Sequence, residues 1–156
     1  MRTLVAAVAA AGITAVVGGA TVALAQPHSA TGSTIKLAAH QTSEKSVDVG
    51  HKGYGPGDED VSAARLTSGG TTAGTFDGVC TATLVAKTAG HQLCTQTFRL
   101  NKGEVTSTGS VTAGKAGPAP FNWAITGGTG SYAKARGYVH VIPGNKTVHM
   151  VMHLTH

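Results

Sequence analysis

The sequence predicts an all-β protein, an eight-stranded antiparallel β-barrel. Apolar and polar residues alternate with a period of two over several consecutive runs, and turns rich in glycine or proline separate these runs. No stretch of useful length shows the three-and-four spacing of a helix. Counting the runs gives eight strands, a number at which a small antiparallel sheet can close on itself and leave no edge.

The chain begins with a segment typical of a secretory signal peptide. Arg2 supplies a positive charge, an Ala/Val/Gly-rich apolar run follows to about Val22, and Ala23-Leu24-Ala25 has the small-x-small pattern of a cleavage site. Residues 1–25 are therefore predicted to be removed, and the mature protein to be secreted. An uncleaved membrane anchor is the alternative, because the apolar run is nearly long enough to span a bilayer.

The mature chain has the size of one domain and a modest positive charge. Removing the first 25 of 156 residues leaves 131, enough for a single core. Without Arg2, 11 basic residues stand against 7 acidic ones, a net charge of +4 with histidine neutral. Basic residues form no run and aromatic residues are few, so we expect no nucleic-acid partner.

Two cysteines, Cys80 and Cys94, lie on consecutive strand-like runs. An antiparallel hairpin would bring them close together, and an oxidising compartment favours their pairing. A catalytic thiol is the alternative, but only His91 lies near enough to lower a thiol pKa. We predict a structural disulfide.

The strands can be placed in order along the chain. Residues 26–56 are predicted to be a flexible N-terminal segment with a first strand over 33–40 and an irregular glycine-rich loop after it. The barrel domain is predicted over 57–156. Its strands are expected at 61–67, 75–86, 92–100, 104–112 and 119–126, followed by a C-terminal hairpin.

The C-terminal hairpin can be predicted in register. A turn centred on Gly144-Asn145 would pair Val141 with Val148 and His140 with His149. The apolar face would then consist of Val139, Val141, Val148, Met150, Met152 and Leu154. Two facing histidines could bind a metal, but no third ligand is apparent, and His153 lies about 13 Å along the strand from His149 at ~3.3 Å per residue. We expect no metal site.

Common catalytic motifs do not match. The chain has no G-x-S-x-G elbow, and Gly127-Gly128-Thr129-Gly130 is followed neither by a predicted helix nor by the Lys-Ser/Thr of a phosphate-binding loop. This glycine cluster is therefore predicted to be a turn.

Residues 125–137, with the pattern I-T-G-G-T-G-x-Y-x-x-A-R-G, resemble the signature of the dirigent and allene oxide cyclase barrel superfamily. Gly57-Asp58, the run from Gly74 to Cys80 and the turn at Gly103 are similar to what exported bacterial members carry before it. The resemblance covers roughly residues 57–154. It implies a calycin-like barrel, a homotrimer or homodimer, and a cavity for an apolar or aromatic intermediate.

The resemblance also implies a function without a cofactor. The protein would bind a small apolar or phenolic molecule and steer its cyclisation or coupling, as an isomerase, a cyclase or a dirigent protein. A non-catalytic extracellular ligand carrier or interaction module is the alternative. Asp58 and Arg136 are the predicted catalytic residues, although a loop acid and a structural ion pair are the simpler interpretations. The predicted ligand contacts are Tyr132, Phe76, Phe98 and Trp123.

Overall fold

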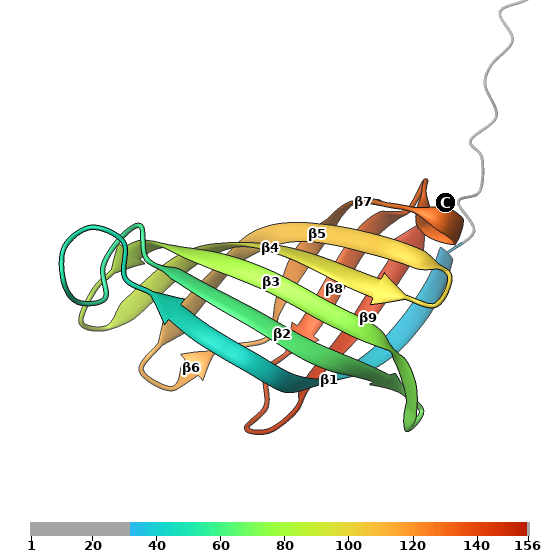
Figure 1. Ribbon diagram of the computed structural model, residues 1–156, viewed down its shortest axis with the longest axis horizontal. Helices are drawn as coiled ribbons and strands as arrows, with labels where there is room; N and C mark the ends of the chain where they lie inside the picture. The colour runs from blue at the N-terminus through green and yellow to red at the C-terminus, as the bar shows by residue number, and fades with distance from the viewer. Residues whose placement is uncertain (1–31, 156) are drawn as a thin grey trace, which may run out of the picture.

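The computed structural model describes residues 32–155 as a closed antiparallel barrel (Figure 1). Eight long strands form its wall, and a two-residue strand, β6, only extends the edge of β5. The elements are β1 Gly32–Val47, β2 Glu59–Ser68, β3 Thr71–Val85, β4 Ala89–Leu100, β5 Gly103–Gly114, β6 Gly117–Pro118, β7 Phe121–Gly128, the 3₁₀ turn η1 Gly130–Tyr132, β8 Arg136–Ile142 and β9 Val148–Thr155.

The strand order explains the closure. The sheet runs β4-β3-β2-β1-β9-β8-β7-β5, and β4 also pairs with β5, so the two ends of the sheet meet. Every pairing is antiparallel. The predicted eight-stranded barrel is confirmed.

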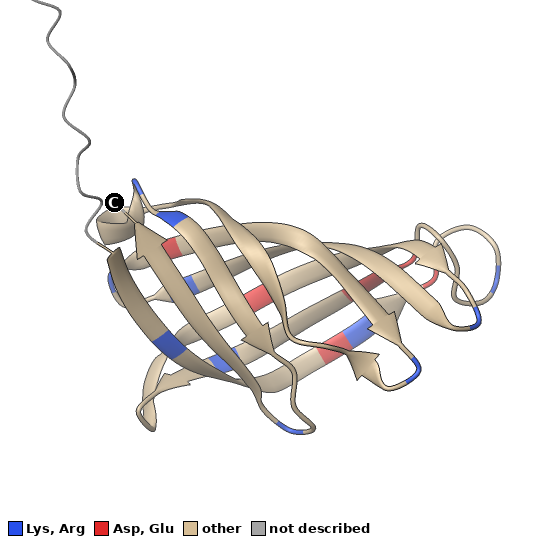
Figure 2. Ribbon diagram, turned by 180° about the vertical axis from the view of Figure 1, so that it is seen from behind, with Lys and Arg blue, Asp and Glu red and all other residues tan. Residues whose placement is uncertain are grey.

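One side chain in two along each strand points into the barrel, as alternation requires. Large apolar side chains fill the interior, and Leu66, Phe98 and Val139 are fully buried. Lys and Arg are spread along strands and loops, with acidic residues between them (Figure 2). Among residues 32–155, no helix is long and apolar enough to cross a membrane.

β1 belongs to the barrel, although residues 26–56 are predicted from the sequence to be a flexible segment. It pairs with β2 on one side and β9 on the other. It also runs to Val47, past the predicted end at His40. The predicted signal peptide lies outside the described residues.

The predicted register of the C-terminal hairpin is wrong by two residues. Val141 faces Met150 rather than Val148, and His140 faces Val151 rather than His149. Proline cannot donate a ladder hydrogen bond, and the chain needs five residues, 143–147, to reverse direction. A shift of two residues preserves the pleat, so the predicted apolar face is correct.

Residues 125–137 form the corner between β7 and β8, with η1 at its centre. Two of its glycines have backbone angles that other residues rarely adopt, with φ of +56° at Gly130 and +122° at Gly137. A Cβ atom at these positions would overlap the carbonyl oxygens of Lys102 and His153 respectively. The glycine cluster is therefore a turn, as predicted.

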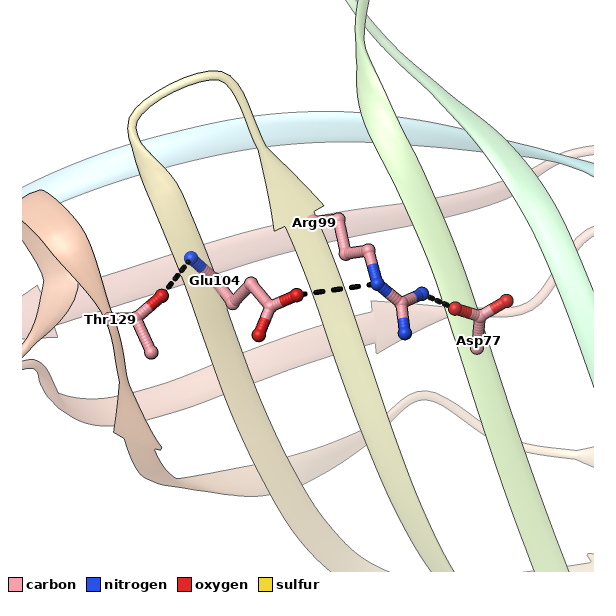
Figure 3. Close-up of polar contacts among 4 residues, drawn as sticks. All are labelled: Asp77, Arg99, Glu104 and Thr129. Carbon is pink, nitrogen blue, oxygen red and sulfur yellow. Dashed lines mark hydrogen bonds and ion pairs between the residues drawn. The ribbon is translucent and has the colours of Figure 1, made fainter.

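A row of polar contacts ties this corner to the outer face of the barrel (Figure 3). The Thr129 hydroxyl accepts a hydrogen bond from the Glu104 amide at 3.0 Å, and the Glu104 carboxylate lies 3.3 Å from Arg99 Nε. Arg99 also pairs with Asp77 on β3. These charged side chains are about half exposed, so the row orients the corner more than it stabilises the fold.

Candidate functional site

A cavity of about 300 Å³ is lined by residues of β1–β3 and β5–β9 and by Pro143 of the β8–β9 loop. Its interior wall is apolar and its rim includes Pro118 and Pro143. A volume of this size is at the lower end of the range for small-molecule sites. The side chains that line its wall include Ala39, Ala64, Phe76, Val111, Phe121, Trp123, Val141 and Met150.

A larger hollow of about 580 Å³ lies on the outer face of β1–β4. Its lining combines short polar and apolar side chains, such as Ser43 and Val61, with the charged side chains of Lys45 and Asp77, and it is open to solvent. Nothing in this lining is both aromatic and enclosed. The interior cavity is therefore the better candidate for a ligand site.

Three aromatic rings form one wall of the cavity. Phe76 and Trp123 lie nearly parallel, at an interplanar angle of 13° and a centroid distance of 6.4 Å. Phe121 meets Trp123 edge to face at 5.2 Å. Phe98 is fully buried behind Phe76, with centroids 5.2 Å apart, and does not itself line the cavity. The wall therefore presents flat apolar surfaces that can stack on a planar molecule.

Glu44 places a carboxylate at the cavity mouth. β1 contains a bulge between Gln41 and Ser43, so Thr42 is an extra residue in the strand. Leu37 and Ala39 point inward before the bulge, and after it Glu44 faces Ser62 on the cavity side. Glu44 also accepts a 2.6 Å hydrogen bond from the Gln41 side chain.

A second polar group joins the β1–β2 loop to β2 and β4. Asp60 accepts hydrogen bonds from Ser46, from Tyr54 and from Gln92, and Gln92 also donates to the Tyr54 hydroxyl at 2.8 Å. Partial burial raises the pKa of the Tyr54 phenol; the Gln92 hydrogen bond opposes this rise, and the nearby Asp60 charge adds to it. The β1–β2 loop is thereby joined to β2 and β4.

Asp58 holds this loop from within. It is only 2% exposed, and its two carboxylate oxygens accept 2.7 Å hydrogen bonds from the backbone amides of Val49 and Gly55. It does not line the cavity. These contacts are those of an acid that organises a loop; its predicted catalytic role stays a prediction.

Arg136 and Tyr132 lie at the β7–β8 corner rather than in the cavity lining. Arg136 is exposed and donates a hydrogen bond to the Ala135 carbonyl at 2.8 Å. Tyr132 is half-buried against the core. Of the predicted site residues, the structure brings Phe76 and Trp123 together at the cavity and leaves these two apart from it.

The predicted disulfide is present. Cys80 and Cys94 face each other on β3 and β4, with an S–S distance of 2.06 Å. Cys80 also lines the cavity, so the disulfide fixes part of its wall.

Three polar cavity residues, Gln41, Glu44 and Ser62, were not predicted from the sequence. Strict alternation along β1 would put Ser43 and Lys45 inside the barrel and Glu44 outside. Only the bulge reverses this order, and no residue type near Thr42 identifies a bulge. The polar pair Gln41 and Glu44 directly after an apolar run was the one available signal.

Solved structures with similar folds act on small organic molecules. Pyocyanin demethylase superposes with a TM-score of 0.66 at 28% identity, over 78% of this chain and 99% of that one. The Diels-Alderase AbmU from Streptomyces koyangensis superposes at 0.62 and 18% identity, over 83% and 70% respectively. A pterocarpan synthase dirigent protein superposes at 0.61 and 17% identity, over 92% and 99%. No protein-family model and no curated protein matches the sequence.

Fold and cavity together define the class, a closed eight-stranded antiparallel barrel with room for one small ligand. The chain shares the barrel fold of the demethylase, the Diels-Alderase and the dirigent protein, so the fold expected from the resemblance of residues 125–137 is confirmed. Proteins with this fold include two Diels-Alderases and a pterocarpan synthase dirigent protein.

Proposed function

We propose that this protein binds a small, largely planar molecule in its barrel cavity and steers a cyclisation or coupling of that molecule. The observation that carries the proposal is the enclosed wall of Phe76, Phe121 and Trp123, with the carboxylate of Glu44 at its mouth. Flat rings hold a planar substrate in one orientation. Restricting a flexible intermediate to one reactive conformer can supply much of a barrier reduction without a nucleophile.

Glu44 is the cavity residue whose carboxylate can interact with a positive charge or a proton on the substrate. In the proposed reaction it stabilises a developing cation or moves a proton at the reacting end of the substrate. Asp58 has both oxygens engaged with backbone amides, and Arg136 belongs to the opposite corner. Glu44 therefore replaces them as the proposed chemical group, and the proposed mechanism needs no cofactor.

The proposed setting is outside the cell. A disulfide between Cys80 and Cys94 is favoured in an oxidising compartment, and the similarity to a signal peptide in residues 1–25 agrees with export. The proposed partner is a small apolar or phenolic molecule.

A non-catalytic ligand carrier is the second candidate, because most of the cavity wall is apolar and only its mouth is charged. Extraction of the purified protein, followed by mass spectrometry, identifies what it retains. We expect a planar apolar compound that the protein then converts to a ring-closed or coupled product of fixed stereochemistry. Retention of the compound without conversion would favour the carrier, and absence of any cavity ligand would contradict both functions.

A further inference from the structure

The cavity has a charged side and an apolar side. Gln41, Glu44 and Ser62 line it from β1 and β2. The lining on β7 to β9 is aromatic or aliphatic and consists of Phe121, Trp123, Val141, Val148 and Met150. Among residues 32–155, Glu44 is the one lining residue with a formal charge. The cavity is therefore negative, although the chain as a whole has a net charge of +5.

No basic side chain of the described residues offsets this charge within the cavity. Lys45, the residue after Glu44, lines the outer hollow instead, as alternation requires. A second carboxylate, Asp60, lies two residues before Ser62 on β2 and so on the same face of that strand. Its hydrogen bonds come from the neutral side chains of Ser46, Tyr54 and Gln92. Within residues 32–155 neither carboxylate forms an ion pair, so both charges are left to attract a cation.

Glu44 lies within reach of the aromatic wall. Its backbone faces Ser62, and Ser62 faces Gly78 on β3, so these residues form one row across the barrel wall. Neighbouring strands lie about 4.8 Å apart, which separates the backbones of Glu44 and Gly78 by roughly 10 Å. The Phe76 ring leans over Gly78, since a Cβ atom there would lie 3.0 Å from Phe76 Cζ. A molecule of two fused rings can therefore contact both the carboxylate and this ring.

The Glu44 carboxylate is oriented but not saturated. Gln41 Nε2 donates a 2.6 Å hydrogen bond to Glu44 Oε2 and so engages one of its two oxygens. A carboxylate accepts hydrogen bonds and does not donate them, so it selects a donor or a cation. The faces of aromatic rings carry a negative potential and also attract cations. Both features of the cavity therefore favour a positively charged ligand and disfavour an anion.

We propose that the cavity ligand is a planar organic cation, a fused aromatic ring system with a quaternary or protonated nitrogen. Its rings pack against the aromatic wall, and its charge lies beside Glu44. This inference rests on the function proposed above and names the substrate class. It makes Glu44 a determinant of specificity in the binding step, because a neutral molecule of the same shape gains the packing but not the attraction to the carboxylate.

Two probes of the same shape test the inference. N-methylquinolinium carries a permanent positive charge, and 1-methylnaphthalene carries none. Trp123 is the single tryptophan of the chain and lines the cavity, so a change in its fluorescence reports binding there. We expect the cation to bind roughly tenfold more tightly at low ionic strength, from its contacts with ring faces and with the carboxylate. Added salt should reduce this advantage, because it screens the exposed Glu44 charge.

Glu44→Gln removes the charge and keeps the shape of the side chain. It should weaken binding of the cation about fivefold and leave the affinity for 1-methylnaphthalene nearly unchanged. Glu59→Gln is the matched control, because it removes a negative charge of β2 that does not line the cavity, and it should keep the preference of the wild-type protein. Phe121→Leu should weaken both probes, since both pack against the aromatic wall.

The outcomes separate the inference from the function on which it rests. Binding of the cation no tighter than that of 1-methylnaphthalene, or a cation affinity that Glu44→Gln leaves unchanged, would overturn the inference and leave the proposed cavity function standing. Binding of neither probe would contradict the cavity function itself, and the inference with it.

Discussion

Glu44 shows how one extra residue can create a candidate active-site group. Without Thr42 as a bulge residue, alternation along β1 would direct Glu44 to solvent and Lys45 into the barrel. With the bulge, the carboxylate stands beside Gln41 at the mouth of an aromatic cavity. The local charge at the cavity mouth is thus negative, which suits a substrate whose outer end becomes positive.

Glu44→Gln should therefore lower the rate of product formation about 10²- to 10⁴-fold, the usual contribution of a positioned acid or base. The free energy of unfolding of this variant should hardly change, since Glu44 is exposed. Glu59→Gln is the matched control, because Glu59 faces away from the cavity on β2 and does not line it. The rate of turnover of the co-purified compound is measured for both variants. Equal rates in the two variants would exclude a role of Glu44 in the reaction.

Substitution by alanine should lower the free energy of unfolding by different amounts at two glycines of the β7–β8 corner. Gly137→Ala forces a Cβ into the carbonyl of His153 at a φ of +122° and should cost roughly 3 kcal/mol or more of unfolding free energy. Gly127→Ala brings its Cβ no closer than 3.5 Å to Thr106 Oγ1 and should cost at most about 1 kcal/mol, the β-strand propensity range. Urea denaturation of both variants checks the contrast, and equal midpoints would refute it.

For single strands, sequence periodicity predicts which residues point into the barrel better than it predicts which residues they face on the neighbouring strand. Val139 and Val141 were placed on the apolar face from alternation alone, and both are buried. The predicted pairing of these residues with β9 was wrong because Pro143 lengthens the turn between β8 and β9. The length of a turn depends on contacts that the local sequence does not reveal. A shift by a whole pleat changes every pair without changing either face.

The β3–β4 hairpin should depend on its disulfide. Replacing Cys80 and Cys94 together by alanine should lower the free energy of unfolding by roughly 3 kcal/mol, because a closed loop of this length restricts the unfolded chain by about that amount. Chemical denaturation compares the double variant with the oxidised wild-type protein. The reduced wild-type protein is the control and should behave as the double variant does; an unchanged midpoint in both would contradict the expectation.

The β1–β2 loop should lose stability in alkali. Because the pKa of Tyr54 is raised in the folded protein, the unfolded chain releases this proton first, near its ordinary value of about 10. The stabilisation is complete below that pH and is lost as the pH rises through the higher pKa of the folded state. Unfolding free energies between about pH 9 and 11 should fall less steeply in Tyr54→Phe. Identical slopes would show that the raised pKa does not contribute.

For the whole molecule, the closed barrel was predictable because a sheet of eight alternating strands has few other ways to pair the backbone N–H and C=O groups of its edge strands. Two aromatic residues of the cavity, Phe76 and Trp123, were among the ligand contacts expected from the resemblance of residues 125–137 to the barrel superfamily. The cavity mouth was not predictable. It joins β1, β6, β7 and the β8–β9 loop, which are distant in sequence and meet only when the barrel closes.

Closure also explains why the most conspicuous sequence motif and the cavity are separate. Residues 125–137 build the β7–β8 corner, and none of them lines the cavity. The motif forms a corner of the barrel, while side chains from eight strands, β1–β3 and β5–β9, line the cavity. The position of a bound ligand is therefore the point that distinguishes this arrangement from others.

A crystal structure of the protein with its co-purified compound measures that position directly. We expect electron density inside the barrel, between the rings of Phe76, Phe121 and Trp123 and below Glu44. Density in the outer hollow of β1–β4 instead, with the interior cavity free of ligand, would contradict the proposed site.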